Sequence, residues 1–322
     1  MCEIYCPESF PSPAADAEYL SSLSGLSGLE RAMHEGKILK ASVLFCDSSM
    51  RLHIDLSGIR GIIERDETVF CRGGEAIKDI AVISRVGKQV AFKVIGFTTE
   101  RGETVALLSR RAAQKECNEK YVSSLRVGDV IPATVTHLES FGAFLDIGCG
   151  LSSLLTVDSI SVSRISHPKE RFSVGDRIYV VIKSKDAESG RIYVSMRELL
   201  GTWEENAAGF EVGQTVSGII RSVESYGIFV ELTPNLAGLA EIKEDMGEVN
   251  ELIGKKSAVY IKSILPDRMK IKLVLIDSCR QSEAFRAPSP IRYFCDTEQT
   301  KHIPYWRYSP PSSRKLIESI FE

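Results

Sequence analysis

The sequence predicts a mainly β protein made of three tandem five-stranded barrels joined by short helical linkers. Three observations support this fold class: a phrase repeated at a fixed interval, apolar residues that alternate with period two inside each repeat, and helix-forming segments between the repeats. The chain has 322 residues, of which 43% are hydrophobic and 26% are charged. It is therefore long and apolar enough for several folded domains.

The repeated phrase is an aromatic-glycine-aromatic motif. ESFGAFLDIG begins at position 139 and ESYGIFVEL begins at position 224, which is an offset of 85 residues. The offset aligns Phe141 with Tyr226, Gly142 with Gly227, and Phe144 with Phe229. A weaker third copy aligns residues 53–56 with residues 144–147. Three copies at domain-sized intervals indicate a repeated structural unit.

Each copy contains several short segments in which apolar and other residues alternate. Examples are residues 130–135, 144–147 and 178–182, and turn sequences such as Gly148-Cys149-Gly150 separate them. Roughly five such strands with little helix between them predict a small closed barrel, because closure removes the unpaired edges of an open sheet.

Helices are expected at residues 26–35, 111–121 and 196–210, which are rich in Ala, Glu, Lys and Leu. The Pro/Ser-rich start is expected to be unfolded, the aromatic-rich tail to pack on the third barrel, and the final LIESIF to form a helical turn. The predicted organisation is a tail and short helix over 1–35, a degenerate barrel over 36–110, a helical linker over 111–126, a barrel over 127–197, a second helical linker over 198–211, a barrel over 212–277, and a C-terminal tail over 278–322.

Side-chain alternation predicts which residues of the repeated phrase face solvent. Leu145 and Ile147 share one face of their strand, and we expect that face to be the barrel interior. The outward positions of the two phrases are then Phe144, Asp146, Phe229 and Glu231.

Phe141 and Tyr226 have the opposite parity, and we expect a bulge at the following glycine to turn these rings outward as well. Two outward rings on one small barrel form a platform on which nucleic-acid bases stack. The competing interpretation is that the rings pack against a neighbouring domain or linker.

The charge distribution favours local rather than overall attraction to phosphate. The formal net charge is −3, which argues against a protein that coats duplex nucleic acid by bulk positive charge. Residues 164–197 nevertheless hold eight Lys/Arg against four Asp/Glu, and residues 255–272 hold six against one. We therefore expect a basic side on the second and third barrels that follows a phosphate backbone.

The remaining residues do not suggest catalysis, a metal or a membrane. The eight cysteines lack Cys-x-x-Cys pairs, and the five histidines are dispersed, so no metal, no cofactor and no enzyme activity are expected. The N-terminus lacks the pattern of a signal peptide, and no apolar run approaches the length of a membrane span. We expect a cytoplasmic protein with reduced thiols and no membrane partner.

The strings VGDVIPATVTHLESFGAFLDIG and ISHPKERFSVGDRIYVVIKSKDAESGRIYVSMRE resemble the S1 RNA-binding domain, a five-stranded OB-fold that is repeated in bacterial ribosomal protein S1. The resemblance is strong over residues 127–197, good over 212–277 and weak over 36–110. The linker ELLGTWEENAAGF and the aromatic tail also resemble those of short bacterial members of this family.

The resemblance implies that RNA is held by two aromatics of the second strand, a histidine further along, and an aspartate and an arginine near the last turn. In the second barrel these positions are Phe141, Phe144, Asp186 and Arg191, and in the third they are Tyr226, Phe229, Asp267 and either Arg268 or Lys270. Thr156 and Glu241 stand at the histidine position, and a carboxylate there should repel phosphate. In the first barrel Met50 and His53 replace the aromatic pair and Arg51 replaces the glycine.

The function implied is single-stranded RNA binding, with messenger RNA as the partner and a role in translation at the small ribosomal subunit of a bacterium. We expect the second barrel to be the main RNA site, the third a helper, and the first a docking or spacer unit. Two alternatives stay open: an RNA chaperone or decay factor that does not join ribosomes, and a protein-interaction scaffold without RNA binding.

Overall fold

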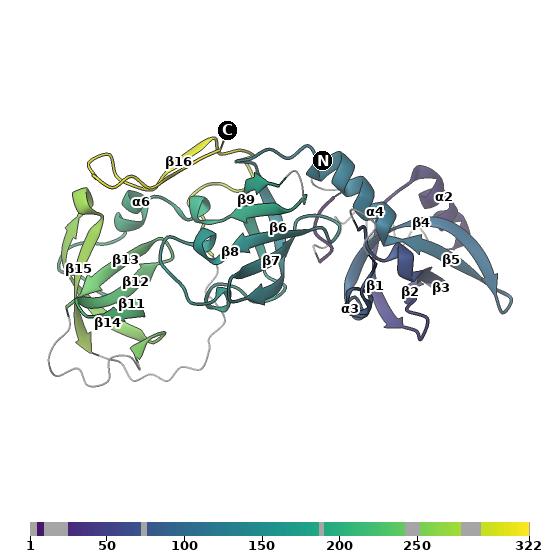
Figure 1. The fold of residues 1–322 in the computed structure, drawn as a ribbon, viewed down its shortest axis with the longest axis horizontal. Helices are drawn as coiled ribbons and strands as arrows, with labels where there is room; N and C mark the ends of the chain where they lie inside the picture. The colour runs from purple at the N-terminus through teal and green to yellow at the C-terminus, as the bar shows by residue number, and fades with distance from the viewer. Residues whose placement is uncertain are drawn as a thin grey trace. The chain divides into compact units, whose positions relative to one another are not determined.

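The protein forms three closed barrels of five strands each, which confirms the predicted fold class (Figure 1). This computed structural model describes residues 5–9, 25–71, 76–186, 190–241, 252–277 and 291–321. The chain divides into two compact units, one made of residues 1–125 with 132–134 and 145–152, and the other made of the remaining residues. Among the residues that the structure describes, no helix is long and apolar enough to cross a membrane.

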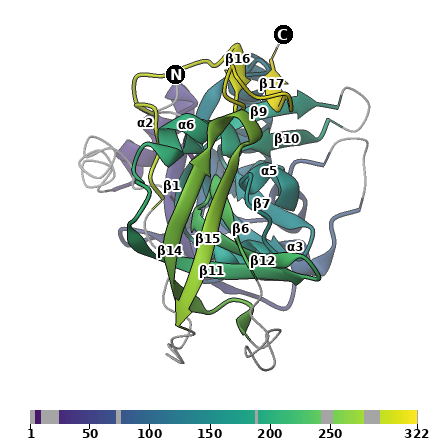
Figure 2. The ribbon, with the colours of Figure 1, turned by 90° about the vertical axis from the view of Figure 1, so that its left-hand side faces the viewer.

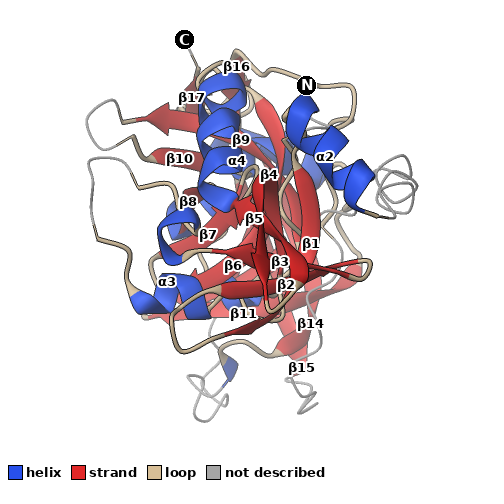
Figure 3. Cartoon of the chain, turned by 90° about the vertical axis from the view of Figure 1, so that its right-hand side faces the viewer, coloured by secondary structure: helices blue, strands red, loops and turns tan. Residues whose placement is uncertain are grey.

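The first barrel has the strand order β1-β2-β3-β5-β4 (Figure 3). Its strands are β1 (Leu39–Cys46), β2 (Leu52–Leu56), β3 (Ile59–Ile63), β4 (Gln89–Glu100) and β5 (Glu103–Ser109), and its short helices are η1 (Arg65–Glu67) and α3 (Asp79–Ile83). Helix α2 (Leu26–Glu35) matches the predicted helix and packs Leu29 and Ala32 into the barrel core. It ends at Gly36, whose φ of 62° is the left-handed conformation that glycine adopts readily.

The second barrel has the order β10-β8-β7-β6-β9. Its elements are β6 (Val130–Glu139), β7 (Gly142–Asp146), β8 (Ser152–Thr156), α5 (Val157–Ile160), η3 (Pro168–Glu170), β9 (Arg177–Lys185) and β10 (Ile192–Ser195). Leu145 and Ile147 are fully buried, as their alternation predicts.

The third barrel has the order β11-β12-β13-β15-β14, with the long strands β14 and β15 side by side (Figure 2). Its elements are β11 (Thr215–Glu224), β12 (Gly227–Thr233), β13 (Leu236–Ala240), β14 (Lys256–Leu265), η6 (Pro266–Arg268) and β15 (Lys270–Asp277). In all three barrels the third and fifth strands pair in parallel, while the other pairs with a known register are antiparallel. One connectivity thus recurs three times, as the sequence repeat predicts.

The connecting segments are helical. The first linker contains α4 (Arg110–Cys117) and η2 (Asn118–Val122), and the second contains η4 (Arg197–Leu200) and α6 (Trp203–Ala207). Thr202 caps α6 by accepting a hydrogen bond from the Glu205 amide, and the Glu205 carboxylate accepts one from the Thr202 amide. The cap satisfies amides that the first helical turn leaves unpaired.

The C-terminal tail forms a small hairpin of β16 (Tyr305–Arg307) and β17 (Glu318–Ile320). The predicted helical turn at 316–321 is therefore wrong. Trp306 and Tyr308 pack into the core cluster of the third barrel, as expected, whereas Phe321 packs with Val130 of the second barrel. The tail thus contacts two barrels of one unit rather than the third barrel alone.

Asp146 is buried, which corrects the prediction that it faces solvent. The amides of Glu8, Gly148 and Gly150 donate hydrogen bonds of 2.7, 2.9 and 2.9 Å to its carboxylate. Arg110 Nε in turn lies 2.7 Å from Glu8 Oε1. Asp146 does point away from the barrel core, but residues 5–9 cover it, so the expectation that the start of the chain is unfolded is wrong for these residues.

Glu231 is also buried, which corrects the same prediction for the third barrel. Its Oε2 lies 2.6 Å from Arg171 Nη2 and 2.8 Å from Arg221 Nε, and Arg221 also pairs with Glu170. Glu170 and Arg171 lie in the connection between β8 and β9 of the second barrel. The acidic residue of each repeated phrase therefore anchors a neighbouring segment instead of facing solvent.

The stability of the Asp146 cluster should depend on pH. Burial, together with the nearby Glu8 carboxylate, raises the pKa of Asp146 from 3.8 to about 6. The folded state then holds this proton more tightly than the unfolded state, so the group contributes stability below pH 3.8 that is lost as the pH rises through about 6. The full difference is about 3 kcal/mol.

Asp146→Asn removes this titration. We expect amide exchange near Gly148 to slow in the wild type, relative to the variant, as the pH is lowered from about 7 to about 4. Hydrogen-exchange mass spectrometry measures the amide exchange rate of both proteins at each pH. The pH dependence of the intrinsic exchange rate cancels in the ratio of the two rates. A ratio that stays constant over this range would contradict the assignment.

Glu231→Ala should destabilise the unit that contains the third barrel by about 3 to 5 kcal/mol, because two buried guanidinium groups lose their shared carboxylate. Both tryptophans, Trp203 and Trp306, pack in the third-barrel cluster, so denaturant unfolding followed by tryptophan fluorescence reports this change. Glu224→Ala, which removes an exposed carboxylate from the same barrel, is the matched control and should be near neutral.

Candidate nucleic-acid interface

Two barrels each carry a pair of adjacent aromatic rings, which we call the aromatic pairs. In the second barrel Phe141 is 53% exposed and Phe144 is half-buried, with ring centroids 6.0 Å apart and planes at 90°. In the third barrel Tyr226 is 66% exposed and Phe229 is half-buried, with centroids 6.1 Å apart and planes at 90°. The structure thus places the two predicted residues of each pair side by side, and the two pairs have the same geometry.

Phe141 and Tyr226 both face solvent, and for Tyr226 the cause differs from the predicted bulge. Both residues lie in the turn before the second strand of their barrel, where strand alternation does not apply. In the third barrel Val223 pairs with Ile228 and Glu224 with Gly227 in continuous register. The prediction of a bulge at Gly227 is therefore wrong. The turn itself releases the ring to solvent.

The glycine that the two phrases share is explained by a close approach of the third strand of the barrel. A Cβ atom on Gly142 would lie 2.5 Å from the carbonyl oxygen of Leu155, and one on Gly227 would lie 2.8 Å from that of Ala240. Real Cβ contacts are not this short, so only glycine fits between the two rings.

His137 extends the second aromatic pair, which the sequence did not reveal. Its ring centroid lies 6.2 Å from that of Phe144, with the planes tilted by 31°. The exposed ring is oriented by Glu139, whose Oε1 is 2.7 Å from His137 Nε2. Three rings therefore lie along one exposed surface of the second barrel.

In the third barrel, strand register connects the aromatic pair to basic side chains. Phe229 pairs with Leu239, and Leu239 pairs with Lys272. Paired residues on neighbouring strands face the same side, so Lys272 lies two strands away, about 10 Å, on the face of Phe229. Lys270 is two residues earlier on the same strand and shares this face. Sequence reasoning named Lys270 but missed Lys272.

Register also identifies the equivalent positions of the second barrel. Tyr193 pairs with Leu154, which the repeat aligns with Leu239. Tyr193 therefore corresponds to Lys272, and Arg191 corresponds to Lys270. The predicted pair Asp186 and Arg191 lies at the exposed β9–β10 turn, where the Asp186 amide donates a 2.9 Å hydrogen bond to the Arg191 carbonyl.

Arg268 is the less suitable of the two cations proposed for the third barrel. It belongs to η6, one turn before β15, and its Nε lies 3.6 Å from Asp267 Oδ2. Both side chains are largely exposed. The strand register therefore makes Lys270, rather than Arg268, the counterpart of Arg191.

Not every basic residue of the two stretches lies on these faces. Arg171 is buried against Glu231 and is not on an exposed surface. Lys183 is more exposed, but it donates a hydrogen bond of 2.8 Å to Ser159 and lies 3.9 Å from Asp158. The basic excess of the second barrel is therefore smaller on its surface than the sequence count suggests.

The position expected for the family histidine lies beside each aromatic pair. Thr156 ends β8, and its Cα would be 3.1 Å from a Cβ on Gly142. Glu241 directly follows β13 and is 74% exposed, and its Oε1 lies 3.9 Å from Lys262 Nζ. The ammonium group of Lys262 offsets the negative charge of the Glu241 carboxylate, which alone would repel phosphate.

The first barrel differs more than its sequence alignment indicates. Met50 is half-buried against the barrel core and Arg51 pairs with Asp47, so neither takes the role of an exposed ring. His53 stacks at 4.3 Å on Phe45, which is 50% exposed. Phe45 was missed because it lies on the first strand, outside the repeated phrase.

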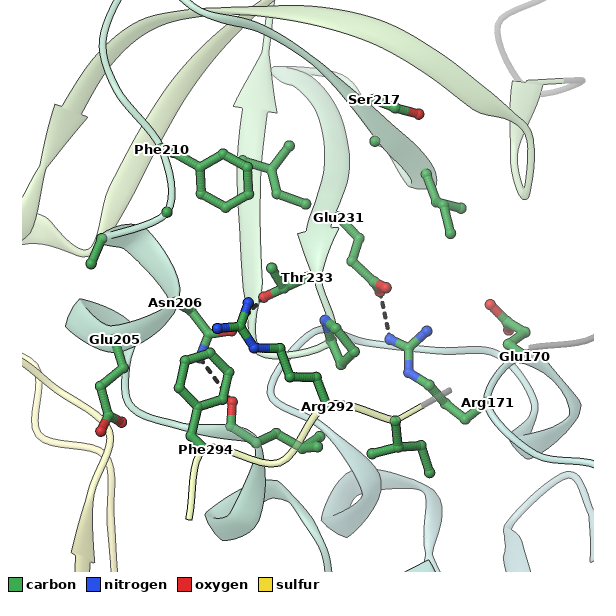
Figure 4. A pocket seen from close by; sticks show the side chains of 18 of the residues that line it. Glu170, Arg171, Glu205, Asn206, Phe210, Ser217, Glu231, Thr233, Arg292 and Phe294 are labelled. Carbon is green, nitrogen blue, oxygen red and sulfur yellow. Dashed lines mark hydrogen bonds and ion pairs between the residues drawn. The ribbon is translucent and has the colours of Figure 1, made fainter. Parts of the chain in front are cut away.

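A cavity of 780 Å³ lies beside the third barrel, between β11, β12, the second linker and the tail (Figure 4). Its charged lining side chains are Glu170, Arg171, Glu205, Glu231, Lys256 and Arg292. The acidic and basic groups balance, and the Arg171–Glu231 and Arg292–Phe294 contacts already engage several of them. The exposed aromatic pairs are therefore better suited to a polyanion than this cavity is.

Within the described part of the chain, no cluster of three His, Cys, Asp or Glu side chains is arranged to hold a metal ion. The eight cysteines include a buried group, Cys6, Cys117 and Cys149, in the unit of the first barrel. Cys2 and Cys279 lie outside the described residues.

Comparison with known proteins gives consistent matches. Residues 124–197 match the model of the S1 RNA binding domain. The chain is 30% identical over 235 residues to small ribosomal subunit protein bS1 of Staphylococcus aureus strain COL, covering 69% of this chain and 59% of that protein. It is 33% identical over 208 residues to the protein of that name from Staphylococcus epidermidis, covering 61% and 52%.

The solved structure of GSP13 from Bacillus subtilis is 30% identical over 23% of this chain and 57% of that chain, with a TM-score of 0.22. The chain spans 52% to 59% of the length of these two curated relatives. Residues 124–197 therefore match the S1 RNA-binding domain, and the chain is similar over 208 to 235 residues to bacterial proteins named small ribosomal subunit protein bS1.

Proposed function

We propose that this protein binds single-stranded RNA on the aromatic pairs of its second and third barrels. The observation that carries the proposal is the repeated pair geometry: in each barrel an exposed ring lies edge-to-face with a half-buried ring. Exposed aromatic rings cost free energy in water, and a base stacked on one contributes about 1 to 3 kcal/mol without requiring a sequence. Two such sites on one chain raise the effective concentration of each other.

The cations beside the rings fit the phosphates of the same strand. Lys270 and Lys272 share the face of Phe229, and Arg191 occupies the equivalent place in the second barrel. RNA held in this way has its bases on the rings and its backbone along the fifth strand of the barrel. The proposal assigns Phe141, Phe144, Asp186, Arg191, Tyr226, Phe229, Lys270 and, with a smaller role, Arg268 to this interface.

The similarity to small ribosomal subunit protein bS1 supports a role in translation. In this role the protein binds messenger RNA at the small ribosomal subunit of a bacterial cytoplasm and acts as a binding protein rather than as an enzyme. The second barrel, with three rings on one surface, is the main site, and the third barrel adds a second contact.

Phe141→Ala with Phe144→Ala should weaken binding to a short unstructured RNA by about 2 to 6 kcal/mol, because two stacking surfaces are removed. Fluorescence anisotropy with a labelled oligonucleotide measures this change. Tyr305→Ala is the matched control, since Tyr305 is an exposed aromatic of the tail hairpin and belongs to neither repeated phrase. Unchanged affinity in a folded double variant would favour the scaffold function instead.

Binding should weaken with salt, with a slope of about 0.7 in log affinity against log salt for each phosphate neutralised on a single strand. Lys270→Ala with Lys272→Ala should reduce the magnitude of that slope by about 1.4 if both lysines contact phosphate. Titrations at several salt concentrations measure the slope. A slope that is the same in the wild type and the variant would place the phosphates elsewhere.

The protein should sediment with small ribosomal subunits from a bacterial extract, and the Phe141/Phe144 double variant should retain less messenger RNA in that fraction. Sucrose-gradient fractionation followed by immunodetection and RNA quantification measures both quantities. RNA binding without subunit association would instead support an RNA chaperone or decay factor.

A further inference from the structure

The third barrel carries a carboxylate, Glu241, beside its stacking surface, where the second barrel has Thr156. The second barrel also has an ion pair, but it joins Lys183 to Asp158, two residues beyond Thr156. Ile228 pairs with Ala240 and Phe229 with Leu239, so the next position, Glu241, lies opposite Gly227. Glu241 directly follows β13 and its side chain is exposed, one residue after the strand in which Leu239 pairs with Phe229. The backbone of Glu241 is thus next to Gly227, the residue that follows Tyr226 and precedes the strand of Phe229.

The second barrel confirms how close this position is to the rings. Thr156 is the counterpart of Glu241 at the offset of 85 residues, and its Cα would be 3.1 Å from a Cβ on Gly142. Gly142 lies between the rings of Phe141 and Phe144 in sequence. The two barrels therefore present a hydroxyl and a carboxylate, respectively, at one site beside a shared aromatic geometry.

Lys262 adds a hydrogen-bond donor, its ammonium group, next to the carboxylate of Glu241, which is an acceptor. Its Nζ lies 3.9 Å from Glu241 Oε1, and the two side chains are 56% and 74% exposed. An ion pair this exposed contributes little to folding stability. Both groups therefore remain accessible to a ligand, and together they add almost no net charge to a surface that must accept phosphates.

The four bases differ in how they fit this pair. Guanine presents two neighbouring N–H donors, N1 and N2, that a carboxylate accepts together, and next to them the O6 acceptor that fits an ammonium group. Adenine and cytosine each offer an amino donor to the carboxylate, while uracil places its single N–H between two oxygens that repel it. An unpaired base stacked on Phe229 leaves this edge free to be read.

We infer that Glu241 and Lys262 make the third barrel selective for guanine in single-stranded RNA, whereas the second barrel, with Thr156, binds bases with little discrimination. The inference rests on the proposed RNA-binding function of the aromatic pairs. The third barrel then discriminates between bases, and the second barrel contributes affinity that does not depend on the RNA sequence.

The test uses the full chain with Phe141→Ala and Phe144→Ala, so that the third barrel dominates binding. Its affinity is measured by anisotropy for four uracil-rich oligonucleotides that differ only in a central G, A, C or U. We expect the guanine oligonucleotide to bind about tenfold tighter than the uracil one. Glu241→Thr, which copies the second barrel, should reduce this ratio to about onefold while leaving affinity for the uracil oligonucleotide within a few-fold.

A reciprocal variant tests the second barrel. With Tyr226→Ala and Phe229→Ala silencing the third barrel, Thr156→Glu should shift the preference of the second barrel toward guanine. Thr156 also interacts with Ser159 in α5, so circular dichroism must first show that this variant is folded. If it is not, the Glu241→Thr comparison decides alone.

The outcomes separate the inference from the function on which it rests. Equal affinity for all four oligonucleotides, with normal binding, would overturn the guanine selectivity and leave RNA binding intact. A guanine preference that survives Glu241→Thr would also overturn it. Failure of the wild-type chain to bind any of the four would overturn the proposed function itself.

Discussion

The close approach of the third strand to a glycine is the constraint on which the proposed RNA surface depends. The carbonyl oxygens of Leu155 and Ala240 lie 2.5 and 2.8 Å from where a Cβ atom on Gly142 or Gly227 would stand, which is closer than side chains tolerate. Because the glycine has no side chain, the turn before it and the second strand after it both lie close to the third strand of the barrel. The aromatic ring of the turn and the aromatic ring of the second strand then lie edge-to-face. The exposed stacking surface is thus a consequence of backbone packing, and the same packing explains why the phrase recurs with its glycine.

The acidic residue of the repeated phrase serves the fold rather than the ligand. Asp146 collects three backbone amides and Glu231 collects two guanidinium groups, and both carboxylates point away from their barrel core. One outer surface of the strand therefore carries two kinds of residue, a ring that stays accessible and a carboxylate that another segment covers. Each phrase joins its barrel to a further part of the chain while presenting an aromatic to solvent.

The sequence was sufficient to predict the barrels and the composition of each aromatic pair, because both depend on local alternation and on an 85-residue offset. It was insufficient for Asp146 and Glu231, because alternation tells which residues leave the barrel core but not which segment, distant in sequence, covers them. Lys272 and Phe45 were missed for a related reason: only the pairing of strands shows that they share a face with, or stack on, a residue of the repeated phrase.

Phe141 and Tyr226 sit in turns rather than in strands, and this has a consequence for how such a protein changes over generations. The side chain of such a turn residue contributes to neither the hydrogen-bond ladder nor the barrel interior, so its replacement leaves the register of the sheet unaltered. Mutation can therefore strengthen, weaken or abolish ligand contact in one copy while the architecture and the other copies persist. An array built in this way can lose a ligand site and still fold, and the first barrel, which lacks the aromatic phrase, has the same five-stranded architecture.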